Sequence, residues 1–560
     1  MGPAIQARWR RVTRAARAPR RRDTAAQGRR LEIERCLAEH GLRTGPRRFA
    51  RRTATAGEGF VERLAAALER LGPVFTAFGR YLAARADLFP AADCLRLAAL
   101  PDETAPAPAA VMLALIGEQL GRPPADLFAS FEETACESSL LFQAHHARLP
   151  GGEEVVVRAV RPGLKEQMAL DLGCFDLLAG LPGLEAGEGP STADLAEAAG
   201  DFEQALARSV DLTGQAEGLE AMSADVAAAG GITLVAAPGV VRALTAPGVI
   251  VCQRLAGTTL ASLLRADGPG GEPPDAGTRH GWAHRLAVAW MEQALRGSVF
   301  PIEPVPGNVL LLADGRLAFV GGSFARATTA LQQNVWAYLA AAGHDPDAAC
   351  SSLLREMKRR GPGSEEKLRL RLRQAIPFRD GAWSAAGDSL AELLFVQWRA
   401  ARASGFEPGT RMSPFCRGLC SMATTVRLLD RDCDAVREGF AAVRVRASVE
   451  PLREMLDPRQ LRGELARYAV LLARMPHDLD RALTLAAEPR EPPGSPGPEA
   501  AGGRGQERAV LLGALVMALA ALSLVARQLT AAGWKGIEPV AAIVALVLGG
   551  LILRAVGRRG

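Results

Sequence analysis

Two pairs of side chains in this chain have a spacing that metal chemistry can use. His280 and His284 stand four residues apart, as do Cys416 and Cys420, so on a helix each pair would share one face. A metal site needs further ligands, yet no Glu stands between the two histidines and no third ligand is evident. For both pairs the sequence therefore favours simple packing on one helical face over metal binding.

Lysine, which much phosphate and Schiff-base chemistry requires, is scarce. Of the 67 basic residues only four are lysines, namely Lys165, Lys358, Lys367 and Lys535. All the others are arginines, which are longer, planar and permanently charged. Chemistry that needs a lysine must use one of these four positions.

The basic charge is gathered at one end of the 560-residue chain. Residues 1–52 hold sixteen Arg against four acidic residues, so the remainder is mildly acidic although the net charge is +6. A body of that sign, with only 5% aromatic residues, excludes a specific nucleic-acid surface. The Arg-rich head, residues 1–29, is open to two interpretations, a transit peptide or a solvated tail that touches anionic lipid.

The C-terminal end has the composition of a membrane anchor. Ala509–Ala526 is apolar and free of charge, and a second apolar stretch follows from Pro539, so residues 509–556 predict a transmembrane helical hairpin. Residues 488–508 are rich in Pro and Gly and predict a flexible tether. Arginines at the outer ends of the hairpin favour a body on the cytoplasmic side of a bacterial inner membrane.

Between these ends the chain mixes helical and strand patterns. Helical spacing covers 60–84 and 109–120, whereas 144–160 is typical of a strand, a tight turn and a second strand. A further hairpin is predicted around Asp314-Gly315, and everything over 331–487 has helical spacing. A small sheet followed by a helical lobe predicts a mixed α/β (α+β) fold with two lobes.

Five motifs in this body resemble, in order, those of the UbiB/AarF atypical kinase-like family. They are LGPVFTAFGRYLAARADLFP (71–90), QAHHARL (143–149), VVVRAVRPG (155–163), PIEPVPGNVLLLADGRLAFV (301–320) and RGLCSMATTVRLLD (417–430). The resemblance covers roughly residues 30–556. It implies a two-lobed protein-kinase-like fold with an N-terminal helical extension over the nucleotide site, ATP and Mg²⁺ as cofactors, and a membrane role in ubiquinone and related isoprenoid lipid synthesis.

The resemblance also assigns the nucleotide-binding positions, and several carry the wrong residue. The strand lysine falls at Arg158 and its acidic partner at Gln215, which has no charge. A Glu-x-Asp signature survives only as Ser209 and Asp211. The Lys-x-Gly-Gln of the family's extension aligns with Ala77, Phe78, Gly79 and Arg80, where only Gly79 matches.

The catalytic and metal-binding positions are altered as well. Glu303 stands where the family has a catalytic Asp, one methylene longer, and Asn308 is retained as a metal ligand. Gly321 replaces the Asp that holds magnesium in kinases. Because Gly offers no ligand and Mg²⁺ requires hard oxygens, these changes predict a degenerate kinase site.

The sequence thus predicts a membrane-anchored pseudokinase that supports isoprenoid quinone synthesis or lipid handling, with a quinone precursor and quinone-synthesis enzymes as partners. An active kinase or ATPase with altered metal use, and a membrane-tethered scaffold with no quinone role, are the alternatives. The predicted domains are the head (1–29), the helical extension (30–125), the kinase-like domain (126–345), a helical region (346–487), the tether (488–508) and the hairpin (509–556).

Overall fold

The computed structural model describes residues 24–42, 59–181, 190–229, 234–265, 274–379, 382–383 and 389–456, which lie in a unit spanning Met1–Leu456. The predicted tether and transmembrane hairpin lie outside the described residues, as does most of the Arg-rich head. Among the described helices, none is long and apolar enough to cross a membrane. The hairpin therefore stays a prediction from the sequence.

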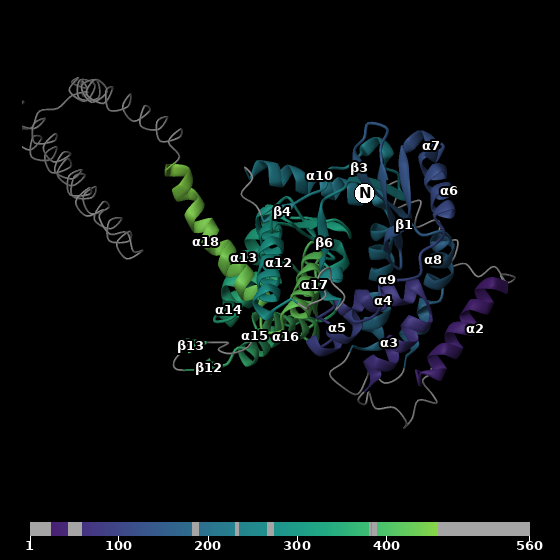
Figure 1. The fold of residues 1–560 in the computed structure, drawn as a ribbon. Coiled ribbons are helices and arrows are strands. Elements are labelled where there is room, and N and C mark those ends of the chain that lie inside the picture. Colours follow the sequence, from purple (N-terminus) through teal and green to yellow (C-terminus); the bar gives the residue numbers. More distant parts are fainter. Residues whose placement is uncertain are drawn as a thin grey trace, which may run out of the picture. The chain divides into compact units, whose positions relative to one another are not determined.

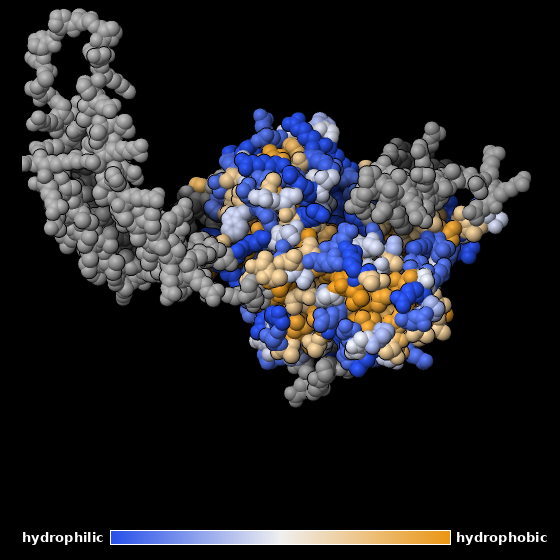
Figure 2. All heavy atoms as spheres, turned by 90° about the horizontal axis from the view of Figure 1, so that it is seen from above, coloured by the Kyte–Doolittle hydropathy of each residue, from blue (hydrophilic) through white to orange (hydrophobic). Residues whose placement is uncertain are grey.

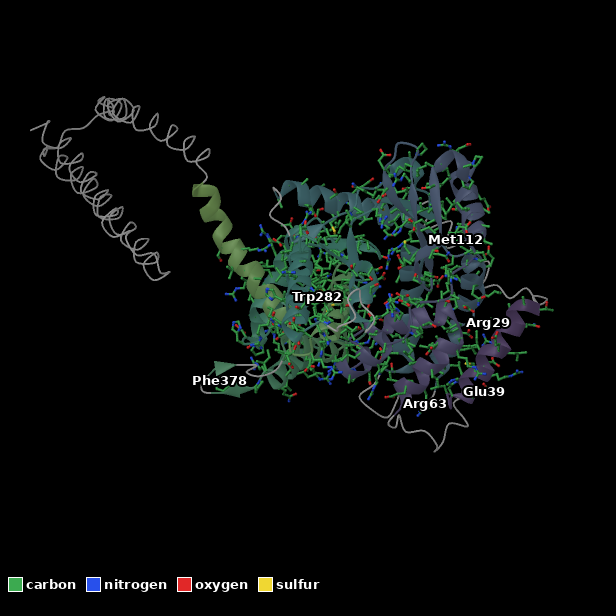
Figure 3. All side chains as sticks on the ribbon, viewed as in Figure 1. Arg29, Glu39, Arg63, Met112, Trp282 and Phe378 are labelled. Carbon is green, nitrogen blue, oxygen red and sulfur yellow. The ribbon has the colours of Figure 1, made fainter. Side chains whose placement is uncertain are left out.

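The N-terminal extension is helical. Its elements are α2 (Thr24–Glu39), α3 (Phe60–Arg70), α4 (Pro73–Ala83), α5 (Ala91–Ala98), α6 (Ala109–Leu120) and α7 (Pro124–Leu127). The prediction of one continuous helix over 60–84 is wrong, because Gly72 adopts φ 99° and Pro73 begins a new helix. The start of α2 lies inside the predicted head, and Arg29 (Figure 3) docks this helix by donating from Nε to Asp171 Oδ1 at 2.7 Å.

An antiparallel sheet follows the extension, with strand order β1-β2-β3-β5 (Figure 1). Its strands are β1 (Ser130–Ser138), β2 (Phe142–Arg148), β3 (Glu154–Val160) and β5 (Val249–Gln253). The predicted strand–turn–strand over 144–160 is confirmed, and Gly152 takes the positive φ of 92° that its tight turn requires. Arg158 lies on β3, between Ala144 of β2 and Ile250 of β5.

Helices and a second sheet complete the kinase-like part. The helices are α8 (Leu164–Leu172), α9 (Thr192–Ser209), α10 (Leu212–Ala228), α11 (Leu260–Leu264) and α12 (Ala276–Arg296), with 3₁₀ turns η1 (Phe175–Gly180), η2 (Arg242–Leu244) and η3 (Pro306–Asn308). The strands are β4 (Val235–Ala236), β6 (Gly257–Thr259), β8 (Val309–Leu312) and β9 (Leu317–Phe319), in the order β4-β9-β8-β6, beside a ribbon of β7 (Val299–Pro301) and β10 (Phe324–Arg326). The predicted hairpin around Asp314-Gly315 is the β8–β9 turn.

The last described region is mostly helical. It holds α13 (Thr329–Ala341), α14 (Pro346–Leu354), α15 (Glu365–Ala375), α16 (Leu390–Ala403), α17 (Met412–Leu429) and α18 (Ala435–Leu456). The prediction of helix throughout 331–487 is wrong here, because β11 (Met357–Arg359) pairs with β14 (Phe406–Pro408) and β12 (Phe378–Arg379) with β13 (Ala382–Trp383). Gly361 and Gly405, both at positive φ, let the chain turn beside the first of these ribbons.

One hydrophobic core joins the extension to the helical lobe. Phe75 and Phe78 of α4 meet Phe175 and Phe202 with ring centroids 5.1–5.7 Å apart, so α4, η1 and α9 share one aromatic cluster. The thiol of Cys420 on α17 contacts the backbone oxygen of Ala83 at 3.4 Å. Figure 2 shows further hydrophobic residues at the surface, with the largest group in the lower half of the view and smaller groups elsewhere. In the interior, the aromatic cluster and the contact of Cys420 with Ala83 hold the extension against the lobes.

Candidate functional site

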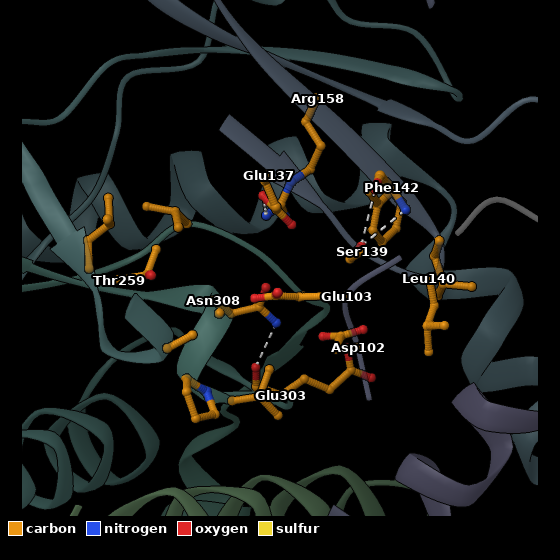
Figure 4. Close-up of a pocket in the computed structure, with 18 of the residues that line it drawn as sticks. Asp102, Glu103, Glu137, Ser139, Leu140, Phe142, Arg158, Thr259, Glu303 and Asn308 are labelled. Atoms are coloured by element: carbon orange, nitrogen blue, oxygen red, sulfur yellow. Dashed lines mark hydrogen bonds and ion pairs between the residues drawn. The ribbon is translucent and has the colours of Figure 1, made fainter. Parts of the chain in front are cut away.

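A cavity of about 1220 Å³ lies where the two sheets, the extension and α17 meet (Figure 4). Its polar lining comes from separate parts of the chain: Asp102 and Glu103 after α5, Glu137 of β1, Arg158 of β3, Ser209 at the end of α9, Glu303 and Asn308 around η3, and Arg417 and Ser421 of α17. The cavity thus gathers most of the positions that the sequence singled out.

Arg158 is buried in this cavity and already has an acidic partner. Its Nη2 donates to Oε2 of Glu137 at 2.5 Å, and its guanidinium lies 5.7 Å from the ring centroid of Phe142. Burial lowers the pKa of Arg158, but the charge of Glu137 and the hydrogen bond to it more than compensate, so the pKa is raised and the ion pair is maintained. Gln215, at the predicted position of the partner, instead donates to the backbone oxygen of Val320 at 3.5 Å.

The sequence alone missed Glu137. The residue stands in β1, whose register against β2 shifts between Ala135 and Glu137, and such a bulge changes which side chains face the cavity. The sequence predicted no strand around residue 137, and no spacing rule relates its carboxylate to Arg158, 21 residues further on.

Gly321 packs directly against this ion pair. A Cβ placed on Gly321 would lie 2.3 Å from Nη1 of Arg158 and 2.3 Å from Oδ1 of Asn308, far inside van der Waals contact. The guanidinium and the Asn308 amide therefore occupy the space into which a longer side chain at 321 would extend. A carboxylate fits there only if both neighbours move.

Glu303, at the position of the catalytic carboxylate, is also engaged. Its Oε1 accepts a hydrogen bond from Nη2 of Arg417 at 3.1 Å and lies 3.5 Å from the hydroxyl of Ser209. Its backbone oxygen accepts from Nδ2 of Asn308 at 3.0 Å, which fixes the loop between them. The Arg417 guanidinium in turn lies 4.7 Å from the ring centroid of Tyr81 on α4. The arginine from α17 thus neutralises the one carboxylate retained at the catalytic position.

The remaining predicted residues divide into two groups. Ala77 and Arg80 of α4 line the cavity, and Arg80 donates to Asp102 Oδ2 at 3.3 Å. Asp211 does not line it: the residue precedes α10 and accepts from the hydroxyl of Thr213 at 2.5 Å. Asp211 and Gln215 are therefore not part of the cavity lining. The structure does bring together the other predicted residues, namely Arg158, Glu303, Asn308, Gly321 and the α4 residues.

Comparison with known proteins finds a kinase-like domain in this part of the chain. Residues 99–350 match the ABC1 atypical kinase-like domain, and curated proteins named "Probable protein kinase UbiB" match within the chain. The chain therefore contains an ABC1 atypical kinase-like domain over residues 99–350, with stretches similar to UbiB proteins.

The similarity to individual UbiB proteins is partial. The protein from Marinobacter nauticus is 42% identical over 120 residues, or 21% of this chain and 22% of its own. The one from Pseudomonas entomophila is 40% identical over 159 residues, 28% of either chain. The matched stretches thus span about a quarter of the length of these relatives. A Mycobacterium tuberculosis protein solved with erythromycin is 18% identical, covers 54% of this chain and 81% of its own, and has a TM-score of 0.34, too low to carry an argument.

The ABC1 kinase-like domain is consistent with ATP and Mg²⁺, yet the residues of this site do not fit the metal as they stand. Mg²⁺ prefers several hard oxygens in octahedral geometry. Near position 321 the chain offers the amide oxygen of Asn308, while the nearest charge is the cation of Arg158. Within the part of the chain that the structure describes, no group of three His, Cys, Asp or Glu with donor atoms close enough for one ion lies in the cavity.

Proposed function

We propose that this chain is a degenerate, membrane-anchored member of the UbiB/AarF family that supports isoprenoid quinone (ubiquinone) synthesis or lipid handling without transferring phosphate. The observation that carries the proposal is the packing of Gly321 against Arg158 and Asn308. Where an active kinase places a metal-binding carboxylate, this chain places a guanidinium that is tied to Glu137. A second arginine, Arg417, binds the carboxylate of Glu303.

The cavity suits a ligand with an apolar part and a polar end. The apolar wall comes from Ala77, Tyr81, Phe202, Leu206 and Leu428. A cavity with an apolar lining and a few polar groups is the usual form of a small-molecule site, and a quinone precursor has both characters.

Two buried polar atoms lie beside the cavity. Arg417 Nε and Ser421 Oγ belong to residues that line the cavity and have no hydrogen-bond partner among the described residues. Both atoms are covered by protein, so a ligand oxygen would satisfy them only after these side chains turn toward the cavity.

The first experiment measures equilibrium binding of ATP to the detergent-solubilised full chain, with and without Mg²⁺. We expect no Mg²⁺-dependent binding in the native chain. The variant Arg158→Lys/Gly321→Asp should gain it, because lysine lacks the Nη atoms that fill the space beside position 321 and Glu137 remains to orient the amine. Gly321→Asp alone is the control and should gain nothing.

Quinone chemistry is tested separately from phosphate chemistry. Deletion of the gene should lower the quinone content of the cell, and the native chain and an Asn308→Ala variant should restore it equally. Unchanged quinone content after deletion would favour a membrane-tethered scaffold with no quinone role.

Membrane anchoring is part of the same proposal and rests on the composition of 488–556. The two apolar stretches behind a Pro/Gly-rich segment favour a helical hairpin with the body on the cytoplasmic side of a bacterial inner membrane. A chain ended at Gly502 should leave the membrane fraction on extraction with buffer alone, whereas the full chain should need detergent. A shortened chain that still sediments with membranes would contradict the anchor.

One observation favours an active kinase or ATPase with altered metal use. Asp102 and Glu103, from the extension, line the same cavity as Asn308 and could supply oxygens from an unusual direction. Both are engaged, however: Asp102 with Arg80, and Glu103 with Arg265. ATP hydrolysis by the native chain that Asn308→Ala abolishes would establish this alternative and overturn the pseudokinase proposal.

A further inference from the structure

The exposed face of α12 carries a pair of histidines outside the cavity. His280 and His284 lie one turn apart, with ring centroids 6.4 Å from each other and ring planes inclined by 26°. Two imidazoles in this arrangement on one helix can bind the same metal ion. The sequence offered no third ligand near them, and on that ground favoured simple packing.

The fold supplies further donors from about 150 residues away. The connection from α17 to α18 and the start of α18 pass in front of the two histidines and bring Asp430, Cys433 and Glu438. His280 Nδ1 lies 2.7 Å from Oδ2 of Asp430, and His284 Nδ1 lies 2.7 Å from Oε2 of Glu438. Cys433 is buried beneath them, with 5% of its surface exposed.

We propose that His280, Cys433 and Glu438 form a transition-metal site, with Zn²⁺ as the ion that suits them best. One donor atom from each of these three residues lies within 4.8 Å of the other two, so small side-chain rotations bring them to the separations of a tetrahedral ion. A nitrogen, a sulfur and a carboxylate oxygen are the ligands that zinc takes in proteins, whereas magnesium and calcium avoid sulfur.

Two neighbours complete the environment of this site. His284 shares the carboxylate of Glu438, so it can act as the fourth ligand or orient that carboxylate. Asp430 holds the imidazole of His280 by one ring nitrogen, which is the role that carboxylates play behind metal-bound histidines. Helix α12 and the region around the start of α18 therefore offer both the ligands and the groups that position them around one ion.

An ion here would fasten two parts of the fold. Helix α12 leads directly into β7 and the loop that holds Glu303 and Asn308, whereas α18 is the last described element before the segment predicted to reach the membrane. The two helices already pack against each other, and the metal would add a stronger link at this end than salt bridges between exposed side chains do. We assign the site a structural role, because it lies outside the cavity and all of its donors come from this chain.

The test measures metal binding to the full, detergent-solubilised chain after removal of bound metal by a chelator. The probe is Zn²⁺ for stoichiometry and Co²⁺ for spectroscopy, because a Co²⁺ ion bound by a thiolate shows a sulfur-to-metal charge-transfer band. We expect one Zn²⁺ per chain, the charge-transfer band with Co²⁺, and a higher unfolding temperature with Zn²⁺ than with chelator.

Variants separate this site from any other. His280→Ala and Cys433→Ser should each weaken binding by more than about 100-fold and remove the Zn²⁺-dependent rise in unfolding temperature, while Asp430→Asn should weaken binding only about 10-fold. His40→Ala is the matched control, since His40 also lies beside a cysteine, Cys36, with Nδ1 and Sγ 3.9 Å apart, and should change nothing. His280 is exposed, so its variant should fold normally even if Cys433→Ser does not.

Three outcomes would overturn the proposal. One is no Zn²⁺ binding at micromolar concentration by the native chain. Another is a charge-transfer band that survives Cys433→Ser, and the third is an equal loss of binding in His40→Ala and His280→Ala.

Discussion

Replacing Gly321 by alanine tests the arrangement of the site directly. The added methyl group would lie 2.3 Å from both Arg158 Nη1 and Asn308 Oδ1, which is about 1.2 Å inside the usual contact distance. Arg158 cannot retreat without stretching its hydrogen bond to Glu137, and its side chain is only 6% exposed. We expect Gly321→Ala to lower the free energy of unfolding by about 2–3 kcal/mol, at the upper end of the range for overpacked interiors.

The cause of that loss can be isolated by a double-mutant cycle. Arg158→Lys removes the Nη atoms, so Gly321→Ala should cost about 1–2 kcal/mol less in that background than in the native one. Gly307→Ala is the control, because a Cβ there meets no heavy atom within 4 Å. It should change the free energy of unfolding by no more than about 0.5 kcal/mol.

The assay is urea denaturation followed by tryptophan fluorescence, since Trp290 and Trp398 are fully buried and should report loss of the core. The shift of the transition midpoint gives the comparison among variants without relying on a long extrapolation. If Gly321→Ala is as stable as Gly307→Ala, the guanidinium does not lie against Gly321, and the argument for a closed metal position fails with it.

Three further predictions concern charged and titratable groups, two of them away from the cavity and one in its lining. Arg402→Ala should lower the urea midpoint by the equivalent of about 3 kcal/mol, because it leaves the buried carboxylate of Asp87 without one of its partners, at 3.1 Å. Burial alone would raise the pKa of Asp194. Hydrogen bonds from the serine that caps its helix and the charge of Arg402 lower it by more than burial raises it, so the pKa in the folded state lies below its usual value. The stability it contributes is present above about pH 4 and lost as pH falls further, so Asp194→Asn should flatten the acid side of the stability profile. Cys136 is exposed to solvent, so a reagent can reach it, yet partial desolvation and then the charge of Glu137 raise the pKa of its thiol to about 11. Its alkylation at pH 8 should therefore be slow and should accelerate in Glu137→Gln.

Local sequence patterns placed much of the fold and part of the site. The helix over 109–120 and the hairpin over 144–160 follow from spacing and from turn residues close in sequence. Arg158 and Asn308 came instead from the resemblance to the UbiB/AarF motifs, each of which is continuous in the chain. Their meeting in one cavity follows from the fold that the motifs share.

The partners of these residues could not be read from the sequence. Glu137 meets Arg158 only because the register of β1 shifts before it, and Arg417 reaches Glu303 across 114 residues. No local spacing rule connects such positions, since a one-residue change of register reverses the face on which a strand side chain lies. The further metal ligands beside His280 were missed for the same reason, because they lie about 150 residues later in the chain.

In the structure, the substitutions at positions 158 and 321 are not independent of each other. Taken one at a time, a lysine-to-arginine change at 158 retains the charge, and a glycine at 321 merely lacks a ligand. In the fold the two depend on each other, because the longer, planar guanidinium occupies the space that only a glycine at 321 leaves open. An aspartate at 321 would force Arg158 and Asn308 to shift and would then pair with the guanidinium rather than with a metal ion, and a lysine at 158 would leave a gap beside Gly321. The two positions therefore behave as one unit, and changing either alone should destabilise the site without restoring a metal-binding carboxylate to it.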